Sequence, residues 1–308
     1  MTIRTGLHTC VVLAAALLAS PSAFGDASGK GPGGDVKRGV YVFDAAGCGS
    51  CHTDPGRRGK DPRPKGEPLA GGLPIVTKFG TYYVPNITPD PQHGIGGWTF
   101  DDFDRALRQG RSPSGDPYYP SFPYPSYTLM ADRDVADLWA YVKTFPSVSR
   151  PDRPHDLDFP YSLRSMAATW LSMYFHEGRL ERDPTKSAQW NRGAYLVRAV
   201  AHCGECHSPR GYLGAVDHDR ALAGNPDGPD GDKVPNITPH QKAGIGTWSL
   251  GDMLEYLDSG MLPDGDFVGA AMADVVENST SKMTAADRRA IAVYLKSLPP
   301  IGKAGDGK

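Results

Sequence analysis

Four cysteines stand in two short motifs whose spacing suits covalent attachment of a large cofactor. Each motif has two cysteines three positions apart and a histidine directly after the second: Cys48-Gly-Ser-Cys51-His52 and Cys203-Gly-Glu-Cys206-His207. Two thiols at this spacing can each add to a vinyl group of haem, and the histidine then places an imidazole beneath the iron. A tight disulfide or a zinc site would use the cysteines but would leave the two histidines unexplained. The motifs predict two covalently bound haem c groups, with His52 and His207 as proximal iron ligands.

The chain begins with a segment typical of an export signal. A weakly cationic start with Arg4 precedes a short apolar run from Cys10 to Ala19, and Ala23-Phe24-Gly25 offers a small-x-small cleavage site. The run is about half of the roughly 20 residues that a membrane-spanning helix needs. We therefore expect residues 1–25 to be a signal peptide cleaved near Gly25. The mature protein is expected in the periplasm, free or held at the membrane by a partner.

Length and composition limit the class of protein. The 308 residues suffice for two ordinary domains, and the net charge is −2 with no basic block that would suggest nucleic-acid binding. Gly and Pro are abundant, with 37 and 28 residues, so long loops are expected. A protein with so much loop needs a further organising element, which an apolar cofactor would supply.

An internal repeat divides the chain. Val84-Pro-Asn-Ile-Thr-Pro89 and Trp98 return 150 positions later as Val234-Pro-Asn-Ile-Thr-Pro239 and Trp248. Upstream, Arg38-Gly39-x-Tyr41 matches Arg192-Gly193-x-Tyr195. Because each copy contains one cysteine motif, the repeat predicts two complete haem domains. We place them at residues 33–146 and 187–301, with a linker at 147–186 and a flexible tail at 302–308.

Each copy is predicted to be mostly helical. Apolar residues recur at helical spacing before each cysteine motif, after each repeated tryptophan and at the end of each copy. The expected helices cover residues 35–46, 98–110 and 132–145 in the first copy and 188–200, 248–260 and 284–298 in the second. The Gly- and Pro-rich stretch after each motif should wrap the haem edge.

These features together resemble a known family. A first helix with a glycine and an aromatic residue, the cysteine motif and a last helix ending like Val293-Tyr-Leu-Lys-Ser-Leu298 resemble class I cytochrome c. The segments Phe79-Gly-Thr-Tyr-Tyr-Val-Pro-Asn-Ile-Thr-Pro-Asp90 and Tyr119-Pro-Ser-Phe-Pro-Tyr-Pro-Ser-Tyr-Thr128 are similar to cytochrome subunits of bacterial membrane-associated dehydrogenases for alcohols, gluconate or nicotinate. The resemblance implies a mostly α fold with two tandem class I cytochrome c domains, whose long loops wrap covalent haems.

The sixth ligand of each iron is expected to be a methionine, the usual alternative to a second histidine. Met130 is the only methionine between His52 and Met166, and it precedes the last helix of its copy. In the second copy the repeat favours Met283, which matches Met130. The family resemblance favours Met272, which lies in a Gly-Ala-Ala-Met-Ala-Asp-Val-Val segment. We choose Met272 and keep Met283 as the alternative.

Two further pairs of repeated residues are candidate haem contacts. Trp98 and Trp248 could donate their indole N–H groups to haem propionates, and Asn86 and Asn236 could fix the repeated loop. Ordinary packing and turn formation explain these residues equally well.

The family resemblance implies an electron-transfer protein and not an enzyme. Electrons would enter from a dehydrogenase catalytic subunit and leave to a quinone, an oxidase or a soluble cytochrome in the respiratory chain. The alternative is a di-haem enzyme, peroxidase-like or thiosulfate-oxidising, which needs one iron with an exchangeable ligand. The apolar segment 159–175 in the linker could pack across both domains, dock a partner subunit or touch a membrane surface.

Overall fold

The computed structural model describes residues 33–54, 56–58, 61–62, 65–228 and 231–302. The predicted signal peptide and the tail after residue 302 lie outside these residues. The α-helices are α1 (Val36–Ala45), α2 (Cys48–His52), α3 (Phe100–Gln109), α4 (Tyr124–Tyr127), α5 (Asp132–Val142), α6 (Arg164–Tyr174), α7 (Ala188–Tyr195), α8 (Gly204–His207), α9 (Leu250–Ser259), α10 (Ala270–Asn278) and α11 (Ala285–Lys296). A π-helical segment, η1 (Leu196–Val200), continues α7, and short 3-10 helices cover η2 (His218–Arg220) and η4 (Thr280–Lys282).

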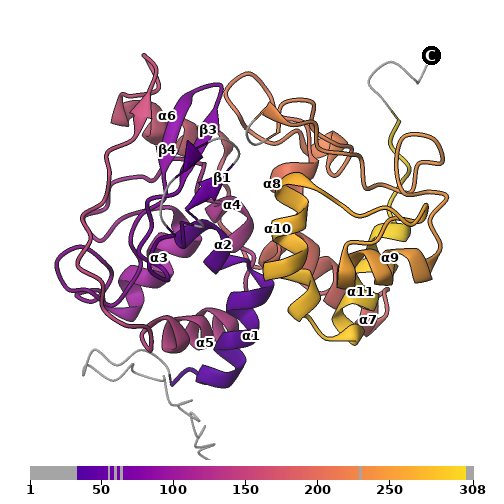
Figure 1. Ribbon diagram of the computed structural model, residues 1–308, viewed down its shortest axis with the longest axis horizontal. Coiled ribbons are helices and arrows are strands. Elements are labelled where there is room, and N and C mark those ends of the chain that lie inside the picture. Colours follow the sequence, from indigo (N-terminus) through magenta and orange to yellow (C-terminus); the bar gives the residue numbers. More distant parts are fainter. Residues whose placement is uncertain (1–32, 55, 59–60, 63–64, 229–230, 303–308) are drawn as a thin grey trace, which may run out of the picture.

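The two parts of the chain lie side by side. Elements α1 to α6 lie on one side of the molecule and α7 to α11 on the other, as the colours of Figure 1 show. Strands occur only on the first side within the described part of the chain. The structure is mostly helical, as expected, with a small sheet added.

The helix pairs α1–α5 and α7–α11 each cross at a glycine. A Cβ at Gly39 would lie 2.1 Å from the carbonyl oxygen of Asp137, and one at Gly193 would lie 2.0 Å from that of Ala290. Because a real Cβ cannot approach an oxygen so closely, each crossing requires glycine. Just before each glycine an arginine makes a two-pronged ion pair with an aspartate of the same crossing, Arg38 with Asp137 and Arg192 with Asp287.

The tyrosine that follows each glycine reaches across to the other side of the molecule. The hydroxyl of Tyr195 donates to Asp134 at 2.7 Å and accepts from the backbone N–H of Ala131 at 3.1 Å. Reciprocally, Tyr41 donates to Asp287 and accepts from the backbone N–H of Thr284. The repeated Arg-Gly-x-Tyr sequence therefore joins each pair of helices internally and also joins the two pairs to one another.

Capping residues define the helices that follow the repeated tryptophans. Thr99 begins α3 and Ser249 begins α9, each with a capping box to an aspartate three positions on. Gly110 and Gly260 end these helices at φ 63° and 81°, a conformation that favours glycine. The helices predicted at residues 98–110 and 248–260 are confirmed, although each is slightly shorter than predicted. Prediction was less accurate for α5, which begins after Ala131 without a side-chain cap and ends at Val142 instead of Phe145.

A small sheet forms where no strand was predicted. Strands β3 (Pro74–Thr77) and β4 (Gly80–Tyr83) make an antiparallel hairpin, and β5 (Asp156–Leu157) from the linker pairs with β4. Strands β1 (Arg57–Arg58) and β2 (Asp61–Pro62) form a separate antiparallel pair. The Gly- and Pro-rich stretch after the first motif is therefore partly held by main-chain pairing with the linker.

The apolar linker segment contains helix α6, which packs on one face. Ala167 and Trp170 are buried, and the Trp170 indole donates to the carbonyl of Leu213 at 3.0 Å. The ring of Tyr124 contacts Trp170 edge-on, so α6 touches both sides of the molecule. Among the described residues no helix is both long and apolar enough to span a membrane.

The crossing glycines give the first testable prediction. Gly39→Ala or Gly193→Ala should destabilise the protein by about 1–3 kcal/mol or more, because the added methyl overpacks a rigid backbone contact. Denaturant unfolding of the purified holoprotein measures the effect. Gly251→Ala on α9 is the matched control, since a Cβ there meets its nearest neighbour at an ordinary 3.5 Å. Equal stability of all three variants would contradict the packing described.

Candidate haem-binding site

Helix α2 presents the first cysteine motif. Gly47 adopts φ 65° and turns the chain from the end of α1 into α2, which carries Cys48, Cys51 and His52. The Nδ1 atom of His52 lies 2.9 Å from the carbonyl oxygen of Pro85, in the repeated loop. Since a carbonyl can only accept, Nδ1 carries the proton and Nε2 keeps a free lone pair. The imidazole is therefore oriented as a metal ligand requires.

Helix α8 presents the second motif in the same way. The Nδ1 atom of His207 lies 2.8 Å from the carbonyl oxygen of Pro235, the repeat counterpart of Pro85. The histidine backbones are also held alike: His52 O accepts from Gly71 N at 2.8 Å, and His207 O accepts from Gly224 N at 2.7 Å. Both predicted proximal ligands thus have the same partner at the same repeat position.

Burial keeps both motif histidines and the first cysteine of each motif uncharged. It lowers the pKa of His52 to about 4 and also lowers that of His207, although the prolyl carbonyls act in the opposite direction. Both imidazoles are therefore neutral at physiological pH. Burial likewise raises the pKa of Cys48 and Cys203 to about 12. In the described ranges no motif cysteine forms a disulfide, and no cluster of three or more His, Cys, Asp or Glu with metal-binding geometry occurs there.

Asn86 and Asn236 hold the loops that supply the prolyl carbonyls. The Asn86 side-chain amide donates to the carbonyls of Val148 and Arg150, at 2.8 and 3.0 Å. Its oxygen accepts from the backbone and the hydroxyl of Thr88. Asn236 repeats the pattern: its amide donates to the carbonyl of Ile301 at 2.6 Å and its oxygen accepts twice from Thr238 at 2.7 Å. Loop fixation is thus visible for both residues.

Trp98 and Trp248 occupy equivalent half-buried positions against the core. Neither indole N–H has a hydrogen-bond acceptor among the residues that the structure describes, so both remain available to a ligand. Trp98 lines the large cavity described next, whereas Trp248 does not.

A cavity of about 1330 Å³ opens in front of the first motif. Its lining includes Cys48, Cys51, His52, Trp98 and Tyr127. Pockets for sizeable organic ligands are typically of about 300–1,000 Å³ and mostly apolar, so a haem fits this space. Two thiols and a free Nε2 on one wall, with apolar side chains opposite, are the donor set that thioether attachment and iron ligation require. The cavity continues to the second motif, since Glu205 and Cys206 also line it.

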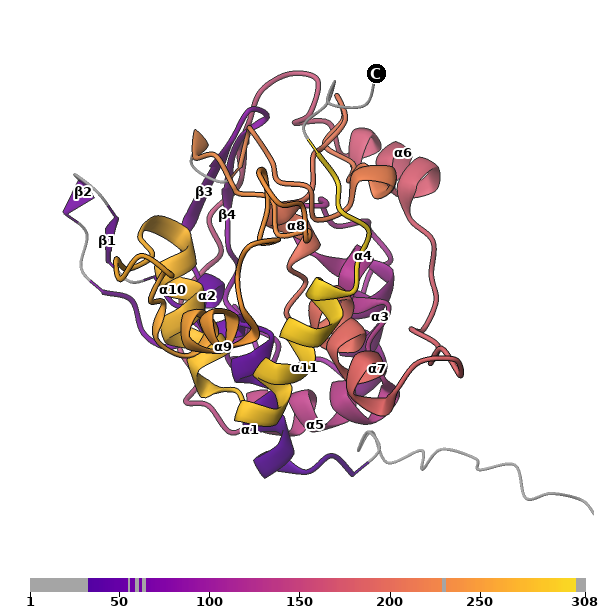
Figure 2. The ribbon, with the colours of Figure 1, turned by 90° about the vertical axis from the view of Figure 1, so that its right-hand side faces the viewer.

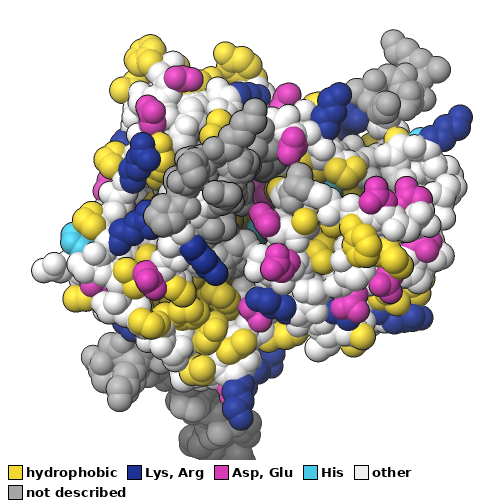
Figure 3. Space-filling view, viewed as in Figure 1, with side chains coloured by type: hydrophobic (Ala, Val, Ile, Leu, Met, Phe, Trp, Pro, Cys, Tyr) yellow, Lys and Arg dark blue, Asp and Glu magenta, His cyan; other side chains and the backbone are white. Residues whose placement is uncertain are grey.

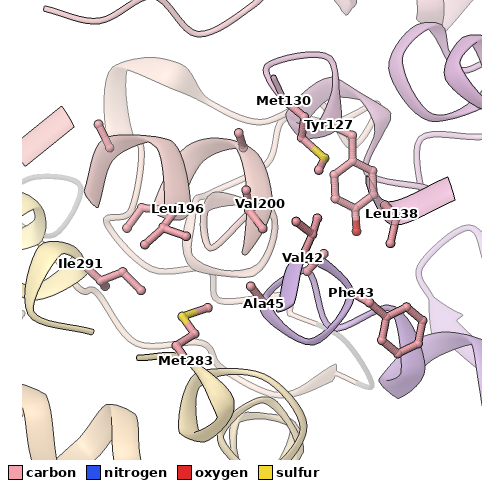
Figure 4. Close-up of a cluster of buried hydrophobic side chains, with 14 of the residues drawn as sticks. Val42, Phe43, Ala45, Tyr127, Met130, Leu138, Leu196, Val200, Met283 and Ile291 are labelled. Atoms are coloured by element: carbon pink, nitrogen blue, oxygen red, sulfur yellow. The ribbon is translucent and has the colours of Figure 1, made fainter. Parts of the chain in front are cut away.

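The candidate distal methionines lie in different surroundings. Met130 is fully buried, and Figure 4 shows it beside Tyr127. Met283 is also buried, at 3 % exposure, and packs in the same core near Ile291. Met272 is half-buried on α10, which packs against α9 and, in both ribbon views, lies beside α2 (Figures 1 and 2). None of the three lines the large cavity.

Position along α10 shows which way Met272 points. Ala271, Asp274 and Val275 line the cavity beside the first motif. Residues 272 and 276 are one turn apart and share a different face. Val276 is buried, and the nearest atoms to a Cβ at Gly260, where α9 ends, include its methyl groups. Position 272 therefore lies on the face of α10 that packs toward the end of α9, in the second copy of the repeat.

Several functional contacts were not predicted from the sequence. The prolyl carbonyls that orient His52 and His207 are backbone atoms, although the repeated Val-Pro-Asn-Ile-Thr-Pro loop was a usable signal. Tyr127 was part of a quoted motif but had no assigned role.

Comparison with known proteins gives the class to which this site belongs. Residues 36–146 match the protein family described as cytochrome c. Together with the histidine geometry, this match defines a c-type cytochrome that binds haem covalently. The chain is 47 % identical over 273 residues to the diheme c-type cytochrome of Cereibacter sphaeroides, covering 87 % of each protein. The chain belongs to the family of that diheme cytochrome.

Cytochrome subunits of dehydrogenases are also similar. The fructose dehydrogenase cytochrome subunit of Gluconobacter japonicus is 38 % identical over 98 % of this chain, and the gluconate 2-dehydrogenase cytochrome c subunit of Pantoea cypripedii is 37 % identical over 85 %. The chain spans 60 % and 59 % of the length of these two proteins.

The loop asparagines give the second prediction. Asn86→Ala should destabilise the protein by about 1–3 kcal/mol for each buried group left without a partner, and Asn236→Ala should behave alike. Thr88 and Thr238 lose their acceptor in these variants. Asn278→Ala, which removes one hydrogen bond to Asp274, is the control and should cost no more than about 1 kcal/mol. If all three variants unfold at the same midpoint as the parent protein, the role of Asn86 and Asn236 in holding their loops is refuted.

Proposed function

We propose that the chain carries two covalently bound haem c groups and transfers electrons from a dehydrogenase to the respiratory chain. The observation that carries the proposal is the matched pair of histidines, each following a pair of motif cysteines and each hydrogen-bonded through Nδ1 to an equivalent prolyl carbonyl, at 2.9 and 2.8 Å. Haem supplies one-electron oxidation and reduction when bound.

The protein's part is to attach, orient and enclose the cofactors. Cys48 and Cys51 hold one haem and Cys203 and Cys206 the other, while His52 and His207 bind iron through Nε2. Met130 and Met272 would complete the coordination, and a thioether at this position raises the reduction potential. Trp98 and Trp248 have free indole N–H groups to offer to propionates. With one histidine and one methionine to hold each iron, no coordination site would remain open to a substrate.

This function implies two haem domains at residues 33–146 and 187–301, joined by the linker 147–186. The helix crossings α1–α5 and α7–α11 fall one in each range and support that division. Covalent haem attachment also fits export to the periplasm with removal of the signal peptide near Gly25.

The dehydrogenase donor is inferred from relatives that are named as cytochrome subunits of such enzymes. The region around α6 is a suitable place for it to dock. Phe159 and Tyr212 are 80 % and 83 % exposed, and Leu163 and Met173 are exposed as well. Hydrophobic side chains are visible over α6 and the β3–β4 hairpin in Figure 3. Met173 also lines the large cavity, so a partner bound here would lie near the first motif. Electrons would leave to a quinone, an oxidase or a soluble cytochrome.

The function is tested by reductive titration of the purified holoprotein. We expect an uptake of two electrons per chain, no high-spin component in the oxidised form, and no spectral change when carbon monoxide is added to the reduced form. Turnover of hydrogen peroxide or thiosulfate together with a high-spin haem would contradict the proposal and favour a di-haem enzyme.

The donor is tested by deleting the gene in its host and measuring oxygen uptake with alcohols, gluconate, fructose and nicotinate in turn. We expect uptake to be lost with one of these substrates and restored by the plasmid-borne gene. Unchanged uptake with every dehydrogenase substrate that the host oxidises would remove the dehydrogenase donor.

The distal ligands give a further prediction. Met272→Ala should abolish the methionine–iron charge-transfer band of one haem and lower its reduction potential, and Met130→Ala should do the same to the other. Met283→Ala should keep both bands but destabilise the fold by about 2–5 kcal/mol, since it removes a buried side chain. Absorption spectra of the oxidised variants decide the question. A band lost in Met283→Ala and kept in Met272→Ala would assign the ligand to Met283.

A further inference from the structure

His202 occupies a backbone position that favours glycine. It directly precedes Cys203 and has φ 39°, whereas Gly47 directly precedes Cys48 and has φ 65°. Left-handed backbone costs a residue with a Cβ roughly 1–2 kcal/mol, and glycine adopts it without that penalty. A strained residue persists where the surrounding structure holds it, and such residues cluster at functional sites. The side chain of His202 is therefore a candidate for a role that glycine cannot fill.

The imidazole of His202 contacts the other side of the molecule. Its ring lies edge-on to that of Tyr127, with centroids 5.3 Å apart and an interplanar angle of 77°. Burial lowers the pKa of His202, whereas Glu205 and the backbone of Ala46 act in the opposite direction, so both groups are close to the ring. Tyr127 belongs to α4, and Figure 4 shows it beside Met130. The ring pair thus connects the distal segment of the first site to the attachment motif of the second.

A polar contact holds α4 to the same motif. The hydroxyl of Ser126 donates to Glu205 at 2.7 Å, and Arg210 makes an ion pair with the other oxygen of that carboxylate, also at 2.7 Å. Two consecutive residues of α4 therefore contact residues on either side of Cys203. The ring pair and the Ser126–Glu205 hydrogen bond therefore lie side by side as two separate contacts between α4 and the second motif.

The two attachment motifs face one cavity. Cys51 and Cys206, the second thiol of each motif, both line it, together with Tyr127 and His202. The second thiol of each motif therefore opens onto the same space as the Tyr127–His202 ring pair.

We propose that electrons pass directly between the two haem sites across the Tyr127–His202 contact, with His202 as the residue that positions this bridge. The inference rests on the proposed function. The step moves one electron, so that one iron is oxidised and the other reduced, and it forms and breaks no bond. Neither ring needs to gain or lose a proton.

The test is the rate of electron exchange between the haems. A fraction of the oxidised holoprotein is reduced by a flash of photoreduced flavin, and the later redistribution is followed at wavelengths where the two haems differ. His202→Gly should slow this redistribution several-fold while the protein unfolds no earlier than the parent, because glycine relieves the strained backbone. Ser126→Ala is the control, since it removes the contact to Glu205 and leaves both rings in place.

A second variant keeps the proposal open to refutation if His202→Gly loses haem. Tyr127→Leu removes the partner ring, and it should slow redistribution as well. Parent-like exchange in Tyr127→Leu, or in a His202→Gly protein that retains both haems, would overturn the bridge and leave the proposed function intact. Failure of the parent protein to take up electrons at all would instead refute the proposed function.

Discussion

The hydrogen bond from a histidine Nδ1 to a prolyl carbonyl is the constraint on which each site depends. At 2.9 Å for His52 and 2.8 Å for His207, it fixes the tautomer and aims Nε2 at the position that iron must occupy. The loops rich in glycine and proline therefore position the carbonyl groups that orient the histidines. They bring Pro85 and Pro235 over the attachment helices, and Asn86 and Asn236 hold them there through partly buried hydrogen bonds.

The same repeated sequence builds the scaffold and joins its two sides. In Arg-Gly-x-Tyr the arginine pairs with an aspartate at its own helix crossing, the glycine permits that crossing, and the tyrosine binds the opposite side. The contacts of Tyr41 and Tyr195 are reciprocal, as in a symmetric dimer whose two subunits have become one chain. One short helical sequence thus builds each helix crossing and joins the two sides of the molecule.

Features determined by residues close together in the sequence could be predicted. The helices after Trp98 and Trp248 were predictable because Thr99 and Ser249 cap their starts and glycine ends them. The haem-attachment motifs were predictable because the spacing of their cysteines and histidine suits thioether formation and iron binding. Non-local contacts were missed: β5 pairs with β4 more than seventy positions away, and the Tyr127–His202 contact exists only once both sides have folded. The roles of Met272 and Met283 stay a prediction, because helical position and core burial favour different residues.

The central claim, that each of two cysteine motifs holds one haem through thioether bonds, is tested most directly by intact mass measurement. Protein from a host that matures c-type cytochromes should exceed the mass of its mature polypeptide by two haems after acid-acetone extraction. A variant with Cys203 and Cys206 both replaced by alanine should retain one. A colourless parent protein, or a parent protein that keeps fewer than two haems, would contradict the account.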